Sequence, residues 1–188
     1  VQEEVERRYA ARIPKPLHLP RPQLIVLNRM LKDPDYVGPA SGTVTTLFGR
    51  EMEHGGVGEP ARVHDIARRQ LLELAEAIRA FPMQAVDKPG KFLWQMLRQI
   101  VWRVSPAVPK VLVLDGVDPD EAWGLNRTGA ILRLGSAGRK ELAENYARFY
   151  LAEWDYFMSR YEDNAAAREA LGAAVRVMSE AAQIAGTM

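Results

Sequence analysis

The 188-residue chain carries 25 Lys and Arg against 24 Asp and Glu, so its net charge of +1 gives no overall sign of nucleic-acid binding. It has no cysteine, which excludes disulfides, zinc–thiolate sites, iron–sulfur clusters and thiol nucleophiles. No apolar run approaches the roughly 18 residues of a membrane span, and the start VQEEVERRYAAR is charged. We therefore expect no membrane partner and no cofactor, and a location in the cytoplasm or, for a viral component, in the virion.

The N-terminal part is rich in proline. After a short helix predicted over residues 2–12, Pro14, Pro16, Pro20 and Pro22 fix an extended segment. Such a segment covers either its own domain or a neighbouring subunit. We predict an N-terminal extended arm over residues 1–22 and a single α-rich globular domain over 23–188.

The next elements are mostly helical. Apolar spacing predicts helices over residues 23–32, over 60–81 and from Asp87 or Lys88 to about Val104, ended by Asp33-Pro34, Pro82 and Pro106 respectively. Residues 33–58 are rich in Gly and Pro and form a long loop with one β-leaning patch over 42–48. Loops of this length are often functional or ordered by a partner.

The C-terminal half predicts strands and a helical pair. The apolar runs 108–114 and 130–134 are typical of buried strands, and helices are expected over 137–161 and 165–185, with Asn164 as N-cap. The expected fold class is α+β, predominantly α-helical: five or six helices, a small β-sheet or hairpin, and a long C-terminal antiparallel helical hairpin.

Residues 145–161 contain seven aromatic side chains, which form two stripes at helical spacing. The small-residue helix that follows can cover one stripe closely, and the helices at 60–81 and 88–104 can cover much of the other. Most of the aromatic mass is therefore expected in the core. The hydroxyl-bearing margin, Tyr146, Tyr156 and Tyr161, is the predicted protein interface, together with Pro14, Pro16 and Pro20 of the arm.

Two weaker patterns suggest other chemistry. Glu51, His54 and His64 are metal-ligand types near glycines, but the two histidines are ten residues apart and match no known ligand spacing. A basic stretch without acids contains Lys88, Lys91, Arg98, Arg103 and Lys110, with Trp102 beside them, and such a face can hold a nucleic-acid backbone. No serine, cysteine or histidine arrangement predicts a catalytic residue.

These patterns favour a non-enzymatic structural or assembly subunit of a larger complex, forming homo- or hetero-oligomers with other protein subunits. A bacteriophage head or tail component is one concrete form. The first alternative is a nucleic-acid-binding accessory protein that uses the basic face of residues 88–110. The second is a metal-dependent enzyme that uses residues 51–65.

Overall fold

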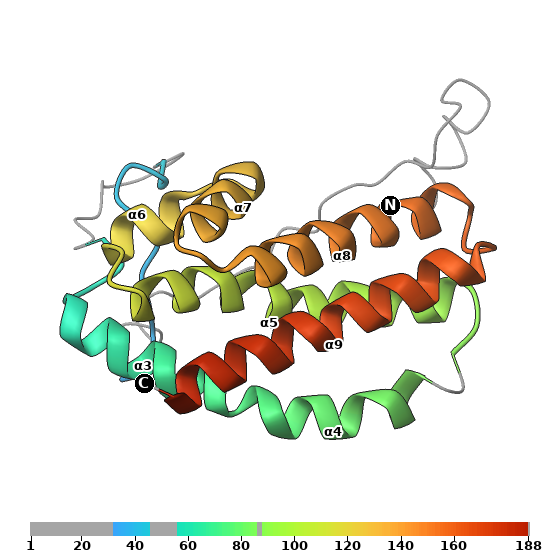
Figure 1. Ribbon diagram of the computed structural model, residues 1–188, viewed down its shortest axis with the longest axis horizontal. Coiled ribbons are helices and arrows are strands. Elements are labelled where there is room, and N and C mark those ends of the chain that lie inside the picture. The colour runs from blue at the N-terminus through green and yellow to red at the C-terminus, as the bar shows by residue number, and fades with distance from the viewer. Residues whose placement is uncertain (1–31, 46–55, 86–87, 188) are drawn as a thin grey trace.

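The computed structural model describes residues 32–45, 56–85 and 88–187. In these ranges every regular element is a helix (Figure 1), namely α3 (Pro60–Leu72), α4 (Leu74–Ala85), α5 (Lys91–Leu114), α6 (Pro119–Gly124), α7 (Arg127–Ser136), α8 (Lys140–Met158) and α9 (Asn164–Thr187). None of these helices has the length and apolar character that crossing a membrane requires.

The predicted α+β fold class is wrong, because the described ranges contain no strand, sheet or β-hairpin. Residues 108–114 form the end of α5, and residues 130–134 lie within α7. Helix α5 packs against every other described helix, so its last turns are buried on all sides. A helix buried all round shows a continuous apolar run, and over a few residues that run is indistinguishable from a buried strand.

Proline does not end the helices where the sequence predicted. Helix α5 continues through Pro106 and Pro109 to Leu114, and α4 continues past Phe81 to Ala85. An interior proline costs a helix about 3 kcal/mol. Around the two prolines of α5, however, Ala107, Val108 and other apolar side chains are fully buried. Burying each larger one contributes about 1.5–3 kcal/mol, which offsets the cost.

Helices α8 and α9 run antiparallel and side by side (Figure 1). Asp163, rather than Asn164, caps α9, because its Oδ1 accepts hydrogen bonds from the backbone N–H groups of Ala165 and Ala166, both at 2.9 Å. The buried face of α9 consists largely of alanine, including Ala167, Ala170, Ala173, Ala174 and Ala181. These small side chains allow the backbone of α8 to approach closely.

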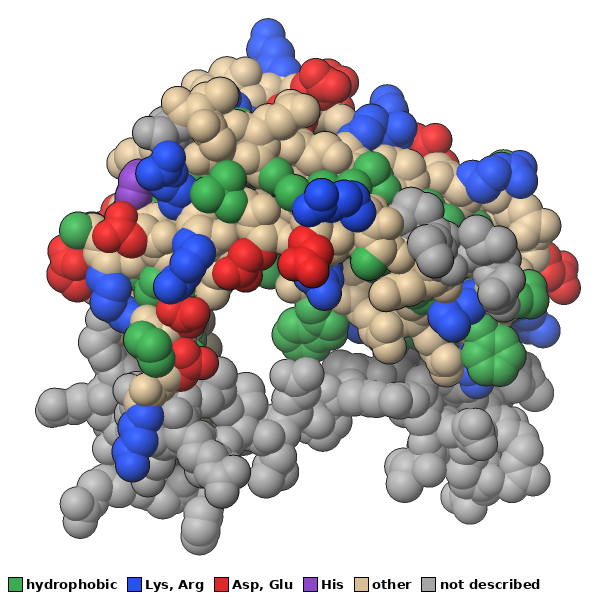
Figure 2. Space-filling model, turned by 90° about the horizontal axis from the view of Figure 1, so that it is seen from below, with side chains coloured by type: hydrophobic (Ala, Val, Ile, Leu, Met, Phe, Trp, Pro, Cys, Tyr) green, Lys and Arg blue, Asp and Glu red, His purple; other side chains and the backbone are tan. Residues whose placement is uncertain are grey.

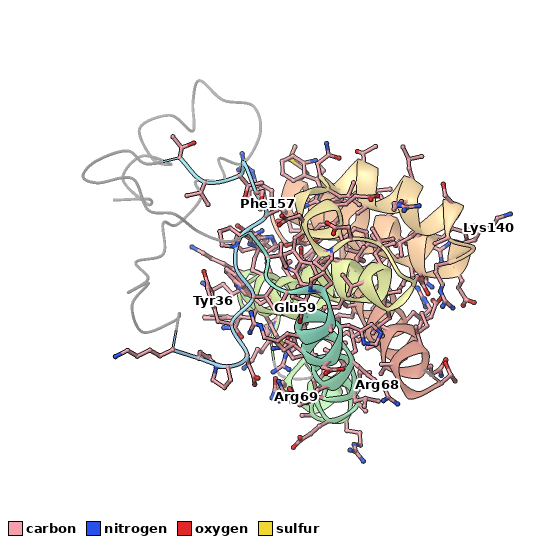
Figure 3. The ribbon with its side chains drawn as sticks, turned by 90° about the vertical axis from the view of Figure 1, so that its left-hand side faces the viewer. Tyr36, Glu59, Arg68, Arg69, Lys140 and Phe157 are labelled. Atoms are coloured by element: carbon pink, nitrogen blue, oxygen red, sulfur yellow. The ribbon has the colours of Figure 1, made fainter. Side chains whose placement is uncertain are left out.

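Helix α3 contacts the loop that precedes it through the side chain of Arg62. Glu59 lies at the start of this helix (Figure 3). Its carboxylate caps the first turn by accepting from the N–H groups of Ala61 and Arg62, and these bonds lower the pKa of Glu59. The Arg62 guanidinium donates to the carbonyls of Pro34 and Tyr36, at 3.0 and 3.1 Å. One helical side chain thereby anchors the preceding loop.

The alanine face of α9 provides a stability test. Ala170→Leu adds three carbons at a fully buried position and should lower the free energy of unfolding by about 1–3 kcal/mol through overpacking. Gln183→Leu, at an exposed position of the same helix, is the control and should change it by less than about 0.5 kcal/mol. Urea unfolding followed by circular dichroism measures both. Equal midpoints for the two variants would contradict the close α8–α9 packing.

Candidate functional site

A cleft of about 450 Å³ lies between α5, α7 and α8. Each helix contributes residues at helical spacing, so one face of each points into the cleft. The lining combines aromatic, cationic and acidic side chains: Trp94, Arg98, Arg127, Thr128, Ile131, Ala147, Tyr150, Leu151, Glu153, Trp154 and Phe157.

Aromatic rings in mutual contact form one wall. The ring of Phe157 lies between two indoles, with centroids 5.2 Å from Trp94 and 5.5 Å from Trp154. Trp154 is 49% exposed and the neighbouring Leu151 66% exposed, so the wall continues onto the open surface. An apolar or planar group entering the cleft would pack against this wall. Aromatic contacts of this kind add about 0.5–1.5 kcal/mol of binding free energy beyond the contribution of buried area.

Two guanidinium groups reach the cleft from different helices. Arg127, the first residue of α7, stacks with its Cζ 3.4 Å from the centroid of the Tyr150 ring. Arg98 of α5 lies over Trp94, with its Cζ 5.8 Å from that ring centroid. Helix α7 begins here, capped by Asn126, and its positive end adds to the field of the two cations.

Glu153 lies between these cations with little access to water. Its side chain is 9% exposed, and its Oε1 lies 3.8 Å from Nη1 of Arg98, which is too long for a hydrogen bond. Within the described residues, this oxygen is the one buried side-chain nitrogen or oxygen without a hydrogen-bond partner. Burial raises the pKa of Glu153, and the charges of Arg98 and Arg127 oppose that rise.

This arrangement is suited to binding. Guanidinium groups recognise carboxylate or phosphate oxygens, and an unsatisfied buried carboxylate oxygen accepts an N–H or O–H donor. The aromatic wall takes an apolar group beside them. The cleft can therefore hold a ligand that carries an anionic group, a hydrogen-bond donor and an apolar part close together.

The structure divides the predicted basic face. Arg98 lies in the cleft, whereas Trp102 and Arg103 line a second hollow of about 430 Å³ between α4 and α5. Lys88 and Lys91 are exposed near the start of α5. Lys110 is partly buried, and burial lowers its pKa to about 8, with Glu73 acting in the opposite direction. On the face drawn in Figure 2, cationic and acidic side chains are interspersed.

Of the predicted metal ligands, only His64 lies in the part that the structure describes. Glu51 and His54 lie outside the described residues, and Nδ1 of His64 lies 3.8 Å from Oδ1 of Asp65. The described ranges contain no group of three His, Asp or Glu side chains that could hold a metal ion.

Asp120 has a structural role. Its carboxylate accepts from the Ser41 hydroxyl at 2.7 Å and from the Val57 N–H at 2.9 Å. It thereby joins two segments of the loop region to α6.

The predicted interface residues have different surroundings. Tyr146 and Tyr156 are buried, and the Tyr156 hydroxyl donates to the Gly90 carbonyl at 2.9 Å. Tyr161 is half-buried. Among the aromatic side chains of α8, Trp154 is the most exposed. Pro14, Pro16, Pro20 and the rest of the predicted arm over residues 1–22 lie outside the described residues.

Arg127 and Glu153 were not among the predicted site residues. Glu153 follows Tyr150 by three residues and precedes Phe157 by four, so helical spacing alone places it on the aromatic stripe. A charged residue inside an apolar stripe is seldom buried without a partner, and that was the available signal. Arg127 carries no comparable signal, because its place in the cleft depends on how α7 packs.

Comparisons of the chain with protein-family models, with curated proteins and with solved structures give no match. Its function must therefore be argued from the cleft itself.

The burial of Glu153 predicts a pH-dependent effect on stability. A folded-state pKa above the unfolded value means that stability falls as the pH rises through the folded-state pKa. Glu153→Gln removes the charge, so it should stabilise the protein at pH 7.5, on the order of 1 kcal/mol. The gain should vanish below the ordinary carboxyl pKa, where Glu153 is neutral in both states.

Urea midpoints at pH 7.5, 6 and 4 measure this effect. Glu144→Gln, at an exposed carboxylate of the same helix, is the matched control and should leave the midpoint unchanged. The compared quantity is the stability of Glu153→Gln minus that of the unmodified chain. A difference that is lower at pH 7.5 than at pH 4 would contradict the prediction.

Proposed function

We propose that this protein is a non-enzymatic subunit of a larger protein assembly and that it holds a segment of a partner protein in the cleft between α5, α7 and α8. The observation that carries the proposal is Glu153 Oε1, a buried acceptor without a hydrogen bond, set in an aromatic wall that continues to the surface. A purely structural carboxylate at this depth would be expected to have its hydrogen bonds within the fold.

The rim of the cleft also supports a macromolecular ligand. Leu151 and Trp154 present apolar surface to solvent next to the enclosed charged end. Aromatic side chains and Arg are enriched at the centres of protein–protein interfaces, and both occur here. The cleft offers no evidence on a bacteriophage origin, so the proposal is limited to a subunit that binds protein.

A peptide library presented in two ways tests the proposal. One library has free C-termini, and the other is fused at its C-terminus so that every peptide is internal. We expect at least one to yield binders to the unmodified chain, and Leu151→Glu should weaken them by roughly tenfold or more, because it places a charge on the apolar rim.

Leu132→Glu is the matched control. Leu132 is 67% exposed, almost the same as Leu151, but it lies on α7 outside the cleft lining. It should leave binding unchanged. Absence of binders in both libraries, or equal loss in the two glutamate variants, would contradict the proposed function.

Nucleic-acid binding is the second candidate, and one observation favours it. Trp102 is 67% exposed beside the exposed Arg103, and Lys91 and Phe92 are exposed on the same helix. Exposed aromatic and cationic side chains together can stack on bases and neutralise phosphates.

The double variant Lys91→Glu/Arg103→Glu tests this candidate without disturbing the cleft. If the face binds single-stranded DNA or RNA, the variant should weaken binding at least tenfold at 50 mM salt, because two phosphate contacts become repulsive. Fluorescence anisotropy with a labelled 20-nucleotide strand measures it. Affinity equal to that of the unmodified chain would eliminate this candidate.

A further inference from the structure

We propose that the cleft between α5, α7 and α8 binds the free C-terminal end of a partner polypeptide whose last side chain is apolar or aromatic. The terminal carboxylate would lie between Arg98, Arg127 and the start of α7. The last backbone N–H would donate to Glu153 Oε1, and the last side chain would lie against the aromatic wall. This inference rests on the proposed function and specifies its ligand.

Charge complementarity excludes a cationic ligand. The cleft holds two guanidinium groups and one carboxylate. The faces of Trp94 and Tyr150, which could attract a cation, already carry Arg98 and Arg127. An entering ammonium or guanidinium group would meet like charges. A group with a single negative charge is therefore favoured at this end.

The buried carboxylate excludes a highly charged anion and requires a donor. A phosphate monoester would bring close to two negative charges next to Glu153, whereas a carboxylate brings one. Oε1 of Glu153 needs an N–H or O–H, since no described residue supplies one. The ligand must therefore combine one anionic group with one donor.

The spacing of the two receiving groups fits one residue. Nη1 of Arg98 and Oε1 of Glu153 are 3.8 Å apart. In a C-terminal residue, the amide nitrogen and the carboxylate flank the same α-carbon, so they can reach two such neighbouring groups at once. Capture of a C-terminal carboxylate by a convergent set of donors is a recurring mode of peptide recognition.

The apolar surface indicates a chain end rather than a free amino acid. The wall formed by Trp94, Phe157 and Trp154 takes the last side chain. Leu151 and the exposed part of Trp154 extend the apolar surface beyond the charged end, and a preceding residue would cover it. A free amino acid would leave that rim in water.

Fluorescence anisotropy with dye-labelled peptides and the full chain tests the inference. The probe is the hexapeptide GSGALF with a free carboxylate. Its C-terminal amide keeps the side chain and the N–H groups but removes the charge, and a third peptide replaces the final Phe by Gly. We expect the amide and the Gly peptide each to bind at least tenfold more weakly, the effect of losing a charge-assisted bond or a buried aromatic ring.

Variants of the protein locate the binding. Arg98→Gln, Arg127→Gln and Glu153→Leu should each weaken the free-carboxylate peptide at least tenfold. Glu153→Gln keeps an acceptor oxygen and should weaken it less than Glu153→Leu. Arg103→Gln, at an exposed arginine of α5 outside this cleft, is the control and should have no effect. Circular dichroism confirms that each variant is folded, and the amide comparison needs no variant at all.

Two results would overturn the inference. One is equal affinity for the carboxylate and amide peptides, and the other is free phenylalanine competing at concentrations equal to those of the peptide. The library experiment separates this failure from failure of the proposed function. If cleft-dependent binders occur only among internal peptides, the proposed protein-binding function stands and C-terminal recognition is rejected. If no cleft-dependent binders occur at all, both the proposed function and the inference are rejected.

Discussion

The close contact between α8 and α9 is the constraint on which the rest of the structure depends. The buried face of α9 is mostly alanine, and the two helices are joined by a short turn in which Asp163 caps α9. A face of small residues brings the α8 backbone near but leaves little room for the seven aromatic residues between 145 and 161. Three of these rings, Tyr150, Trp154 and Phe157, line the cleft that α8 forms with α5 and α7.

The aromatic side chains of α8 divide between the core and the cleft. Phe149 and Tyr156 are fully buried, whereas Tyr150, Trp154 and Phe157 reach the space between α8 and its neighbours. Helix α5 supplies Trp94 and Arg98 from its N-terminal turns, whereas its last turn, Val111–Leu114, is buried by the surrounding helices. The cleft thus lies toward the N-terminal end of the helix that is central to the core.

How far the sequence predicted this arrangement depends on the length of each apolar pattern. Long periodic segments predicted helices at 60–81, in the aromatic stretch and at the C-terminus, although the first of these is divided at Glu73 into α3 and α4. The short segments 108–114 and 130–134 predicted strands and are helical, because segments of seven and five mostly apolar residues do not distinguish the two periods. Asp118 and Asn126 cap α6 and α7, and residues of these types favour a helix start directly after them.

The site itself was only partly open to prediction. The aromatic stripe was visible, but the choice of Tyr146 and Tyr156 as its surface margin assumed that hydroxyl groups mark the exposed side. Both tyrosines are buried, and the Tyr156 hydroxyl has its partner inside the fold, so a hydroxyl group does not mark the exposed side of this helix. The cleft needs side chains from three helices, and no pattern within one helix specifies how the other two approach.

Other buried polar groups of the same chain show what a satisfied structural pair looks like. Asp115 accepts two hydrogen bonds from Arg139, from Nε at 3.0 Å and from Nη2 at 2.6 Å. The buried Asn145 accepts one from Nε of Arg176 at 2.8 Å. In both cases N–H groups of the guanidinium donate directly to the acceptor oxygen, which is the usual geometry of an arginine that stabilises a fold.

Glu153 departs from that pattern although two arginines are near it. Arg98 lies over Trp94 and Arg127 over Tyr150, so both guanidinium groups face aromatic rings, and the carboxylate accepts no hydrogen bond at Oε1 from the described residues. Leaving a buried charged acceptor unpaired costs on the order of 1–3 kcal/mol or more. Replacing Glu153 by an apolar residue would avoid that cost within the aromatic stripe. A carboxylate at this position therefore fits the proposed ligand, whose N–H would donate to it, better than it fits a role in the stability of the fold.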